Sequence, residues 1–279
     1  MKRINRFCIV ANTEKDIGYH VAKQIKSYLT EHGKSARIVS DAIAVKGEED
    51  MDLAIILGGD GTMIQAAKAL TELSLPMMGI NLGTLGFLTE IEKPNMFAVL
   101  DEVMEGNYNI QERIALTGTA RTGNEKKSLG LAVNDCIIGK RGFGRMITTS
   151  VYVNDELVDS YVADGVLIAT PTGSTAYNLS AGGPVLSPAM EGIIITPICP
   201  HSLNKRSIVV SADDRIKVCV GKTREEMTDL ATVSVDGQLL SDAETNDTIE
   251  IEKAKKRIQV VRVSDTGFFE RMRSKLNRK

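Results

Sequence analysis

The first hundred residues alternate between short apolar runs and segments whose apolar positions have a helical spacing. Apolar runs predict strands at 7–10, 36–39, 53–57 and 77–80. Apolar stripes predict helices over 17–29, 62–70 and 94–103. Because strands and helices alternate, we expect right-handed crossovers and a parallel sheet. Residues 1–108 therefore predict a Rossmann-like α/β domain.

Beyond about residue 108 the helical stripes nearly vanish, and short strand-like runs follow one another. These runs lie at 115–120, 131–138, 147–153, 166–170, 193–198, 207–210, 216–220, 232–235, 248–251 and 258–263. Asn154-Asp155 indicates a hairpin turn, although the glycine usual after such a residue is missing. This pattern predicts an all-β, β-sandwich-like domain over residues 109–264.

The last residues return to a helical spacing. Phe268, Phe269, Met272 and Leu276 fall on one face of the predicted helix, and basic residues fall on the other. A basic amphipathic helix is also compatible with a membrane surface. A short helix at the end of a folded chain more often docks on a neighbouring domain, so we expect residues 265–279 to pack back onto the first domain.

The composition is that of a soluble globular protein. The chain has 279 residues, 43% of them hydrophobic, and a net charge of −2, so no overall field attracts it to nucleic acid or to anionic lipid. We expect a cytoplasmic protein, because no signal peptide and no long apolar segment is present. The four cysteines form no CxxC pair and are expected to be buried thiols. The three histidines lack HExxH spacing, and no residue is assigned as a metal ligand.

A glycine-rich loop with one aspartate follows the third predicted strand. Gly58, Gly59 and Gly61 surround Asp60, and Thr62 is expected to open the next helix. Glycines allow a close approach to phosphate and positive φ angles, and the helix N-terminus offers N–H groups to an anion. A carboxylate at such a site is repelled by phosphate. Asp60 is therefore a general base, a metal contact or a helix cap.

A second glycine-rich stretch, GINLGTLGFLTE at 79–90, follows the fourth predicted strand. Parallel strands would bring it beside the first loop, where Asn81 and Phe87 are predicted to line the same cleft. A plain connection between a strand and a helix is the alternative.

Two polar stretches interrupt the β-rich half. Asn134-Asp135 lies inside the apolar run LAVNDCII, so these side chains need polar partners from a ligand or from a turn or bulge of the protein. Residues 164–183 carry Thr172, Ser174 and Thr175 before Tyr177 and Ser180. Hydroxyls, N–H groups and an aromatic ring suit a ribose, amide or adenine, although a Ser/Thr-rich turn would also account for them.

Taken in order, these motifs resemble the NAD kinase family along almost the whole chain. The resemblance rests on GGDGT at 58–62, GxNxGxLGFL at 79–88, ND at 134–135, ADGxxxATPTGSTAYxLSAGGP at 163–184 and VDGQ at 235–238. Diacylglycerol and sphingosine kinases share GGDG but lack TPTGSTAY. No Walker A motif occurs, so metal or main-chain donors must hold the phosphates.

The resemblance implies ATP-dependent phosphorylation of the adenosine-ribose 2′-hydroxyl of NAD, which gives NADP. It also implies Mg²⁺ or another divalent cation with ATP, a homodimer or homotetramer, and NAD bridging the two domains. Asp60 matches the general base. A free Asp has a pKa near about 3.9, so it would accept the hydroxyl proton only late in the transfer.

The remaining site residues are carried over by their motifs. Positions that match NAD contacts are Asp60, Gly61, Asn134, Asp135, Arg145, Asp164, Thr172, Thr175, Ala176, Tyr177, Ser180 and Gln238. Gly58, Gly59, Gly61 and Thr62 form the expected phosphate loop. Many relatives have an arginine where this chain has Val162, so one expected ion pair to the substrate is missing, and Arg145 or Arg141 are candidates to compensate.

Two other classes of function remain open at this point. A lipid kinase would need a wide apolar groove, which the polar TPTGSTAY segment does not favour. A non-catalytic NAD-binding regulator would keep the pocket but lose the catalytic loop, which the intact Asp60 does not favour.

Overall fold

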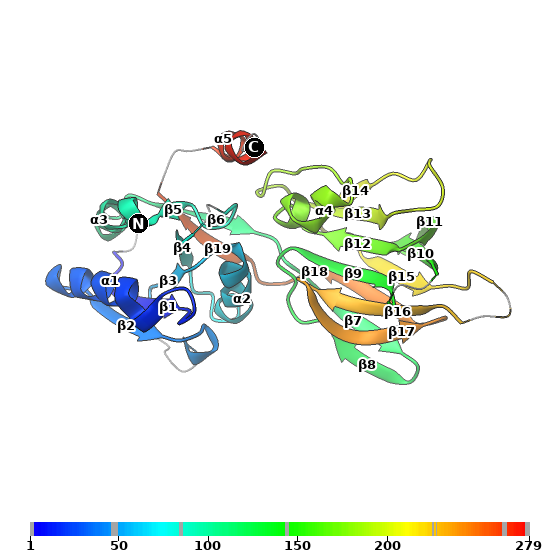
Figure 1. The fold of residues 1–279 in the computed structure, drawn as a ribbon, viewed down its shortest axis with the longest axis horizontal. Coiled ribbons are helices and arrows are strands. Elements are labelled where there is room, and N and C mark those ends of the chain that lie inside the picture. The colour runs from blue at the N-terminus through cyan, green and yellow to red at the C-terminus, as the bar shows by residue number, and fades with distance from the viewer. Residues whose placement is uncertain are drawn as a thin grey trace. The chain divides into compact units, whose positions relative to one another are not determined.

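The computed structural model describes residues 3–45, 50–83, 86–142, 145–224, 226, 228–263 and 267–276. The chain divides into two compact units, shown as a ribbon in Figure 1. The first unit is Met1–Arg113 with Lys256–Lys279, and the second is Ile114–Lys255.

The first unit is built on one mostly parallel sheet in the order β2-β1-β3-β4-β19-β6, with β5 beside β4. Its strands are β1 (Arg6–Ala11), β2 (Ser35–Val39), β3 (Leu53–Leu57), β4 (Met77–Asn81), β5 (Ile91–Glu92), β6 (Asn109–Arg113) and β19 (Ile258–Arg262). Its helices are η1 (Ile17–Tyr19), α1 (His20–Glu31), η2 (Ile43–Val45), α2 (Asp60–Leu70), η3 (Lys93–Asn95), α3 (Met96–Glu105) and α5 (Phe268–Leu276). The chain adds β2 on one side of β1 and β3 on the other, so the strand order reverses between β1 and β3.

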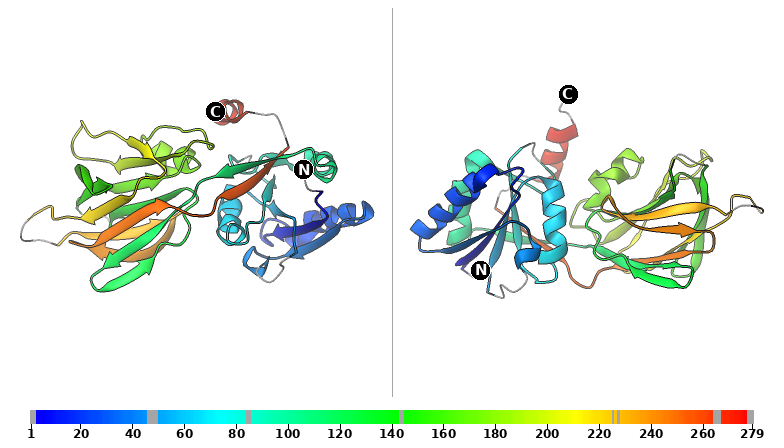
Figure 2. Two further views of the ribbon diagram at one scale, coloured as in Figure 1. Left: turned by 180° about the vertical axis from the view of Figure 1, so that it is seen from behind. Right: turned by 60° about the horizontal axis from the view of Figure 1, so that its bottom comes forward.

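The helices of this unit cover both faces of the sheet, as Figure 2 shows. Alternate strand residues such as Phe7, Ile55 and Ile80 form one buried cluster with Ile25 of α1 and Leu100 of α3. Helix α2 lies on the opposite face. The strands are buried on both sides, which explains their continuous apolar runs.

The second unit is a sandwich of two antiparallel six-stranded sheets, in the orders β11-β10-β15-β18-β7-β8 and β14-β13-β12-β9-β16-β17. Its strands are β7 (Leu116–Thr122), β8 (Glu125–Ser128), β9 (Asp135–Lys140), β10 (Ile147–Val153), β11 (Glu156–Ala163), β12 (Gly165–Ala169), β13 (Gly192–Ile198), β14 (Ile208–Ser211), β15 (Ile216–Val220), β16 (Leu230–Val235), β17 (Gln238–Glu244) and β18 (Thr248–Lys253). The helices η4 (Gly173–Thr175) and α4 (Tyr177–Ser180) are short. Residues of both sheets, including Val151 and Ile168, share one core.

Strands β6 and β19 correct the expected domain boundaries. The strand at 258–263 was expected in the β-rich domain, and residues 109–113 were assigned to that domain without a predicted strand. Instead, β19 pairs with β4 through Val260 and Met77 and runs antiparallel to β6. Both strands therefore complete the first sheet. A short amphipathic strand carries no local signal of the sheet it joins, because its partners are distant in sequence.

The C-terminal helix belongs to the first unit, as predicted, but its buried face differs in part from the expected one. Phe269 is 62% exposed, whereas Arg271 is only 6% exposed. Of the expected apolar face, Phe268 and Met272 are half-buried, whereas Phe269 is exposed and the basic Arg271 is buried instead. Arg271 turns inward because it forms an ion pair with Glu90, and Arg262 pairs with the same carboxylate.

Several local predictions have clear outcomes. The Asn154-Asp155 hairpin is confirmed, and both residues adopt positive φ angles of 49° and 67° in place of the missing glycine. Helix α2 begins at Asp60 rather than at Thr62. All four cysteines are free, but Cys199 is exposed, against the expectation of burial. Among the helices of the described residues, none is long and apolar enough to cross a bilayer.

Candidate functional site

The carboxylate of Asp60 binds the main chain of the second glycine-rich loop. Its Oδ2 accepts the N–H of Phe87 at 2.7 Å, and its Oδ1 accepts the N–H groups of Leu88 at 2.9 Å and Thr89 at 3.1 Å. The Thr89 hydroxyl lies farther away, at 3.3 Å from Oδ1. Gly59, not Asp60, is the N-cap of α2, and every hydrogen bond found for the Asp60 carboxylate among the described residues goes to residues 87–89, so the interpretation of Asp60 as a helix cap is not supported.

These bonds leave the two oxygens of Asp60 unequal. A carboxylate oxygen has about two lone-pair sites. The two N–H groups of Leu88 and Thr89 fill the sites of Oδ1, whereas Oδ2 accepts one N–H among the described residues. Among the residues that the structure describes, one lone-pair site of Oδ2 is thus without a donor and is able to accept a hydroxyl hydrogen.

Two glycines allow this arrangement because a side chain would collide with it. A Cβ on Gly86 would lie 1.7 Å from Oδ1 of Asp60, and a Cβ on Gly58 would lie 2.3 Å from Oγ1 of Thr62. The loop glycines 58, 59 and 61 do not adopt positive φ angles. Glycine is thus required at Gly58 because Thr62 lies so close, and at Gly86 because Asp60 does, rather than for the expected positive φ angles.

Asn81 and Phe87 belong to the same connection after β4. Asn81 Oδ1 accepts the N–H of Gly83 at 2.9 Å, and the buried Nδ2 has no hydrogen-bond partner among the described residues. Lys275 Nζ lies over the ring of Phe87, 4.1 Å from the ring centroid. Phe87 contacts Asp60 through its main-chain N–H rather than its ring, so its predicted role as a cleft lining stays a prediction.

A cavity of about 450 Å³ lies beside the first loop, within the first unit. It is lined by Val10, Asn12, Lys15, Ser40, Asp41, Ala42, Ile43, Gly61, Thr62, Gln65 and Ala66. Most of these residues follow β1 and β2 or lie in the first two turns of α2, and Val10 lies near the end of β1, so the cavity lies at the carboxyl edge of the sheet where the strand order reverses. Open α/β sheets bind their ligands at this position.

Lys15 is the residue of this cavity that sequence reasoning missed. Its Nζ donates to Oγ1 of Thr62 at 3.3 Å, which brings a positive charge to the start of α2. Its position soon after β1 could have identified it, because loops after parallel strands meet at one edge of a sheet.

In the second unit, the Asn134-Asp135 pair is held by Asp236 of the VDGQ motif. The Asp236 carboxylate accepts the N–H groups of Val133 at 3.1 Å, Asn134 at 2.8 Å and Asp135 at 3.3 Å. Asp236 lies in the turn between β16 and β17, where its φ is 49°. Asp236 and Asp60 thus bind three consecutive N–H groups each, in separate units.

The carboxyl of Asp135 is buried at the start of β9, with 4% exposure. Burial, and then the negative charge of Asp236, raise its pKa from 3.8 to about 7. A large fraction of Asp135 is therefore protonated at neutral pH, when it is able to donate as well as accept a hydrogen bond.

The segment after β12 contains two kinds of polar side chain: some are buried and bonded within the protein, and others are accessible. Ser174 and Asn178 are fully buried, and each bonds to the main chain of the segment itself. Thr172 is also buried, and its Oγ1 has no partner among the described residues. The other predicted contacts of this segment, Thr175, Ala176, Tyr177 and Ser180, are half-buried or exposed.

The same segment packs on the Asn134 backbone. The N–H of Thr170 donates to the Asn134 carbonyl at 2.8 Å, and a Cβ on Gly173 would lie 2.1 Å from that oxygen. The structure therefore brings Asn134, Asp135 and Thr172 into one region of the second unit.

The three remaining predicted residues are more dispersed. Asp164 pairs with Lys140 Nζ at 2.7 Å. Arg145 lines a cavity of about 200 Å³ together with Arg141 and Arg224. Gln238 is exposed at the start of β17.

Comparison with known proteins identifies the family. The family model "ATP-NAD kinase N-terminal domain" matches residues 6–108, and "ATP-NAD kinase C-terminal domain" matches residues 133–263. An NAD kinase of Lachnoclostridium phytofermentans is 41% identical over 285 residues, covering 99% of this chain and 100% of that protein. The chain belongs to the NAD kinase family.

Other NAD kinases agree with this assignment. The NAD kinase of Caldanaerobacter subterraneus is 39% identical, with 99% of each chain covered. The crystal structure of an Archaeoglobus fulgidus NAD kinase in complex with ATP is 27% identical, with a TM-score of 0.76 and 97% and 98% coverage. The yeast NADH kinase complexed with NADH, at 23% identity, has the same fold, with a TM-score of 0.80 and coverage of 99% of this chain and 88% of that one.

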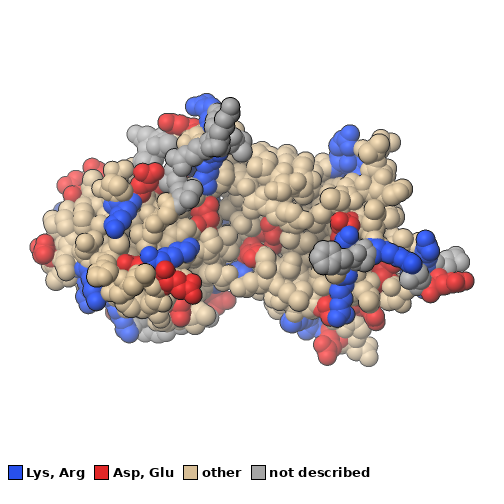
Figure 3. Space-filling model, viewed as in Figure 1, with Lys and Arg blue, Asp and Glu red and all other residues tan. Residues whose placement is uncertain are grey.

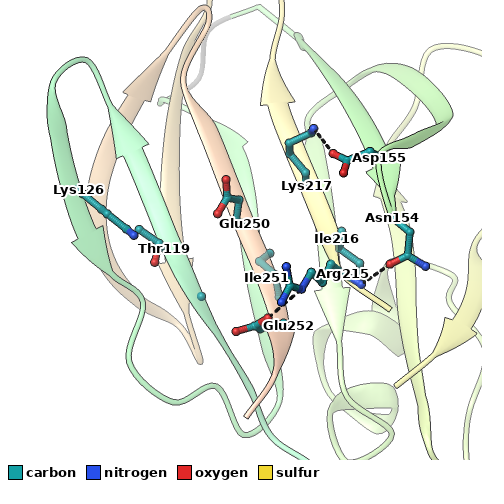
Figure 4. Close-up of a pocket in the computed structure, with 11 residues that line it drawn as sticks. Thr119, Lys126, Asn154, Asp155, Arg215, Ile216, Lys217, Glu250, Ile251 and Glu252 are labelled. Atoms are coloured by element: carbon teal, nitrogen blue, oxygen red, sulfur yellow. Dashed lines mark hydrogen bonds and ion pairs between the residues drawn. The ribbon is translucent and has the colours of Figure 1, made fainter. Parts of the chain in front are cut away.

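A surface pocket of about 380 Å³ on the β11-β10-β15-β18-β7-β8 sheet contains none of the residues predicted from the NAD kinase motifs (Figure 4). Its charges are paired, with Lys217 Nζ at 2.6 Å from Asp155 and Arg215 Nε at 3.4 Å from Glu252. We assign it no part in the reaction. Acidic and basic side chains are likewise interspersed over the face seen in Figure 3.

The acidic, histidine and cysteine residues that the structure describes form no cluster of three able to hold a metal ion. Mg²⁺ that arrives with a nucleotide usually keeps water and phosphate ligands and needs only one or two protein oxygens. A threonine hydroxyl at a phosphate loop is able to serve as one such ligand, and Thr62 offers one beside the cavity, where its Oγ1 also accepts from Lys15 Nζ.

Proposed function

We propose that the protein transfers the γ-phosphoryl group of ATP to the 2′-hydroxyl of the adenosine ribose of NAD, giving NADP and ADP. The main evidence is the hydrogen bonding of the Asp60 carboxylate. Among the described residues its Oδ1 accepts two N–H groups and its Oδ2 only one, so Oδ2 has an acceptor site left beside a helix N-terminus. The family assignment supports the choice of substrates. The ATP complex of the Archaeoglobus relative supports ATP as the donor.

Asp60 is the proposed general base. The ribose hydroxyl donates a hydrogen bond to Oδ2 and attacks the γ-phosphorus. As the new P–O bond forms and the bond to the ADP oxygen breaks, the hydroxyl proton passes to Oδ2. An ordinary carboxylate is a weak base, so the proton moves late, when the attacking oxygen has become acidic. Orientation therefore contributes more than basicity.

For the donor, we propose that the triphosphate lies against the first loop and the start of α2. Gly59 and Gly61 offer main-chain N–H groups and Thr62 a hydroxyl, whereas the N–H groups of Gly58 and Thr62 donate to the carbonyls of Ile80 and Gly59. Gly58 serves the loop through the close approach of Thr62, and Lys15 supplies the positive charge that a Walker lysine supplies elsewhere. Mg²⁺ or another divalent cation bound to the phosphates would neutralise charge on them. The adjacent cavity is large enough for part of the nucleoside.

For the acceptor, we propose that NAD contacts the residues carried over by motif. These are Asp60, Gly61, Asn134, Asp135, Arg145, Asp164, Thr172, Thr175, Ala176, Tyr177, Ser180 and Gln238. The unpartnered hydroxyl of buried Thr172 supports this choice, since a ligand would satisfy it. Asp236 has a positioning role, because it orders the main chain of Asn134 and Asp135.

A coupled assay tests the proposal. Purified protein is incubated with NAD, ATP and Mg²⁺, and an NADP-specific dehydrogenase reports NADP. We expect NADP to form only when both substrates are present. Binding of NAD without NADP formation would favour a non-catalytic regulator, and phosphorylation of a lipid instead of NAD would favour a lipid kinase. Light scattering of the same sample would test the proposed homodimer or homotetramer.

A further inference from the structure

The loop that binds Asp60 is itself held by the C-terminal helix. Arg271 of α5 lies with Nη2 at 3.3 Å from Oε1 of Glu90, and Arg262 of β19 pairs with the same oxygen. Lys275 Nζ lies over the ring of Phe87. Phe87 is the first of the three residues whose N–H groups bind Asp60, and Glu90 directly follows the last of them, Thr89.

These contacts are buried, unlike most ion pairs on a protein surface. Side-chain exposure is 7% for Arg271, 10% for Glu90 and 14% for Arg262. Removing one partner of a buried ion pair leaves the other charge uncompensated and is costly, so loss of Arg271 should disturb Glu90 and the main chain beside it. By contrast, Arg273 on the same helix is exposed.

The charge of Asp60 is part of the same electrostatic environment. Arg113, at the end of β6, is 2% exposed. Burial, and then the charge of Arg271, lower the pKa of Arg113 to about 10, while Asp60 acts in the opposite direction. Arg271 and Asp60 thus both act on one buried arginine. Arg113 therefore lies within electrostatic range of both Arg271 and Asp60.

We propose that α5 positions the general base: Arg271 through Glu90, and Lys275 through Phe87, fix the three N–H groups that orient Asp60. The inference rests on the proposed function, because Arg271 and Lys275 are given the task of positioning Asp60, the proposed general base. The contact of Glu90 with Arg271 holds one end of the main chain at residues 87–89, and the contact of Phe87 with Lys275 holds the other end. Loss of either anchor lets the loop shift, and Oδ2 of Asp60 loses its alignment with the ribose hydroxyl.

Arg271→Ala tests the proposal, with Arg273→Ala as the matched control and Arg271→Lys as the conservative variant. A displacement of about 1 Å at a reacting group costs on the order of 10²-fold in rate, so we expect kcat of Arg271→Ala to fall by about 10- to 100-fold. The KM values for NAD and ATP should change little, since Arg271 is not among the proposed substrate contacts. Arg271→Lys should recover part of kcat, and Arg273→Ala should match the wild type.

A double-mutant cycle separates positioning from a purely structural role. If Arg271 acts through Asp60, Arg271→Ala should have little further effect on the residual kcat of Asp60→Asn. Equal effects in both backgrounds would overturn the proposal. If Arg271→Ala fails to fold, Lys275→Ala serves in the same cycle, because its contact with Phe87 is less buried. Wild-type protein that makes no NADP would refute the proposed function itself, which is a separate result.

Discussion

The carboxylate of Asp60 accepts the main-chain N–H of Leu88 at 2.9 Å, although the two residues are 28 positions apart in the chain. Together with the bonds to Phe87 and Thr89, this contact joins the two glycine-rich loops that follow β3 and β4. The second loop therefore orients the proposed base, rather than only lining a cleft. The first prediction concerns the glycine that makes the contact possible.

Gly86→Ala should displace the carboxylate of Asp60, since the new Cβ would lie 1.7 Å from Oδ1. We expect kcat to fall by at least about 10-fold, in line with the cost of misplacing a reacting group. Gly83→Ala is the control, because a Cβ there meets nothing within 4 Å. Steady-state kinetics on both variants checks the prediction, and similar kcat values for the two would contradict it.

Asp236→Asn should weaken NAD binding without abolishing the reaction. Asparagine tolerates the positive φ of the turn, but its neutral amide is a weaker acceptor for the three N–H groups. We expect the KM for NAD to rise by about 10-fold, corresponding to one weakened charge-assisted bond, with little change in the KM for ATP. Asp242→Asn, which alters an exposed ion pair with Arg141, is the control. An unchanged KM for NAD would refute the positioning role.

The predictable parts of this molecule are those with local signals. The apolar runs predicted β1, β3, β4 and most strands of the sandwich within a few residues, because burial on one or both faces sets the pattern. The placement of β6 and β19 was missed, since pairing between distant segments leaves no local signal. The burial of Arg271 on α5 was missed for a similar reason: its partner is Glu90, far away in the sequence.

In the candidate site, too, the residues within motifs were predictable and the residues that position them were not. The motifs located Asp60 and Asn134-Asp135, but not the groups that orient them. That Asp236 binds the N–H groups at 133–135, or that Lys15 donates to Thr62, depends on which loops meet in space. Glycine at Gly86 was recognised as part of a flexible loop, whereas its structural reason is the close approach of Asp60.

Lys15→Ala should selectively impair use of ATP. Removing the ammonium group beside Thr62 takes away a positive charge at the proposed phosphate site. We expect the KM for ATP to rise by about 10-fold or more, since a hydrogen bond to a charged group contributes about 1.5–3 kcal/mol. The KM for NAD should stay near its wild-type value. Lys23→Ala, an exposed lysine on α1, is the control. Equal KM values for ATP in both variants would exclude this role.

The raised pKa of Asp135 predicts a pH dependence of stability. Its pKa is about 7 in the folded protein against its usual value of 3.8, so between these values the folded state binds the extra proton. The free energy of unfolding contributed by this group is therefore greatest at low pH and falls as the pH rises toward about 7, by up to about 1.4 kcal/mol per pH unit.

Asp135→Asn removes this titration, and urea unfolding of both proteins between pH 4.5 and 7.5 measures the difference. We expect the stability of the variant relative to wild type to increase with pH across this range. Two parallel stability curves would show that Asp135 does not titrate as described.

The most direct test of the central claim is the turnover of Asp60→Asn in the NADP-forming assay, with NAD affinity measured by calorimetry on the same samples. Asparagine cannot accept the hydroxyl proton, so we predict that kcat falls by roughly 10² to 10⁴ while the dissociation constant for NAD changes far less. A variant that binds NAD and still turns over at a near-normal rate would contradict the assignment of Asp60 as the general base.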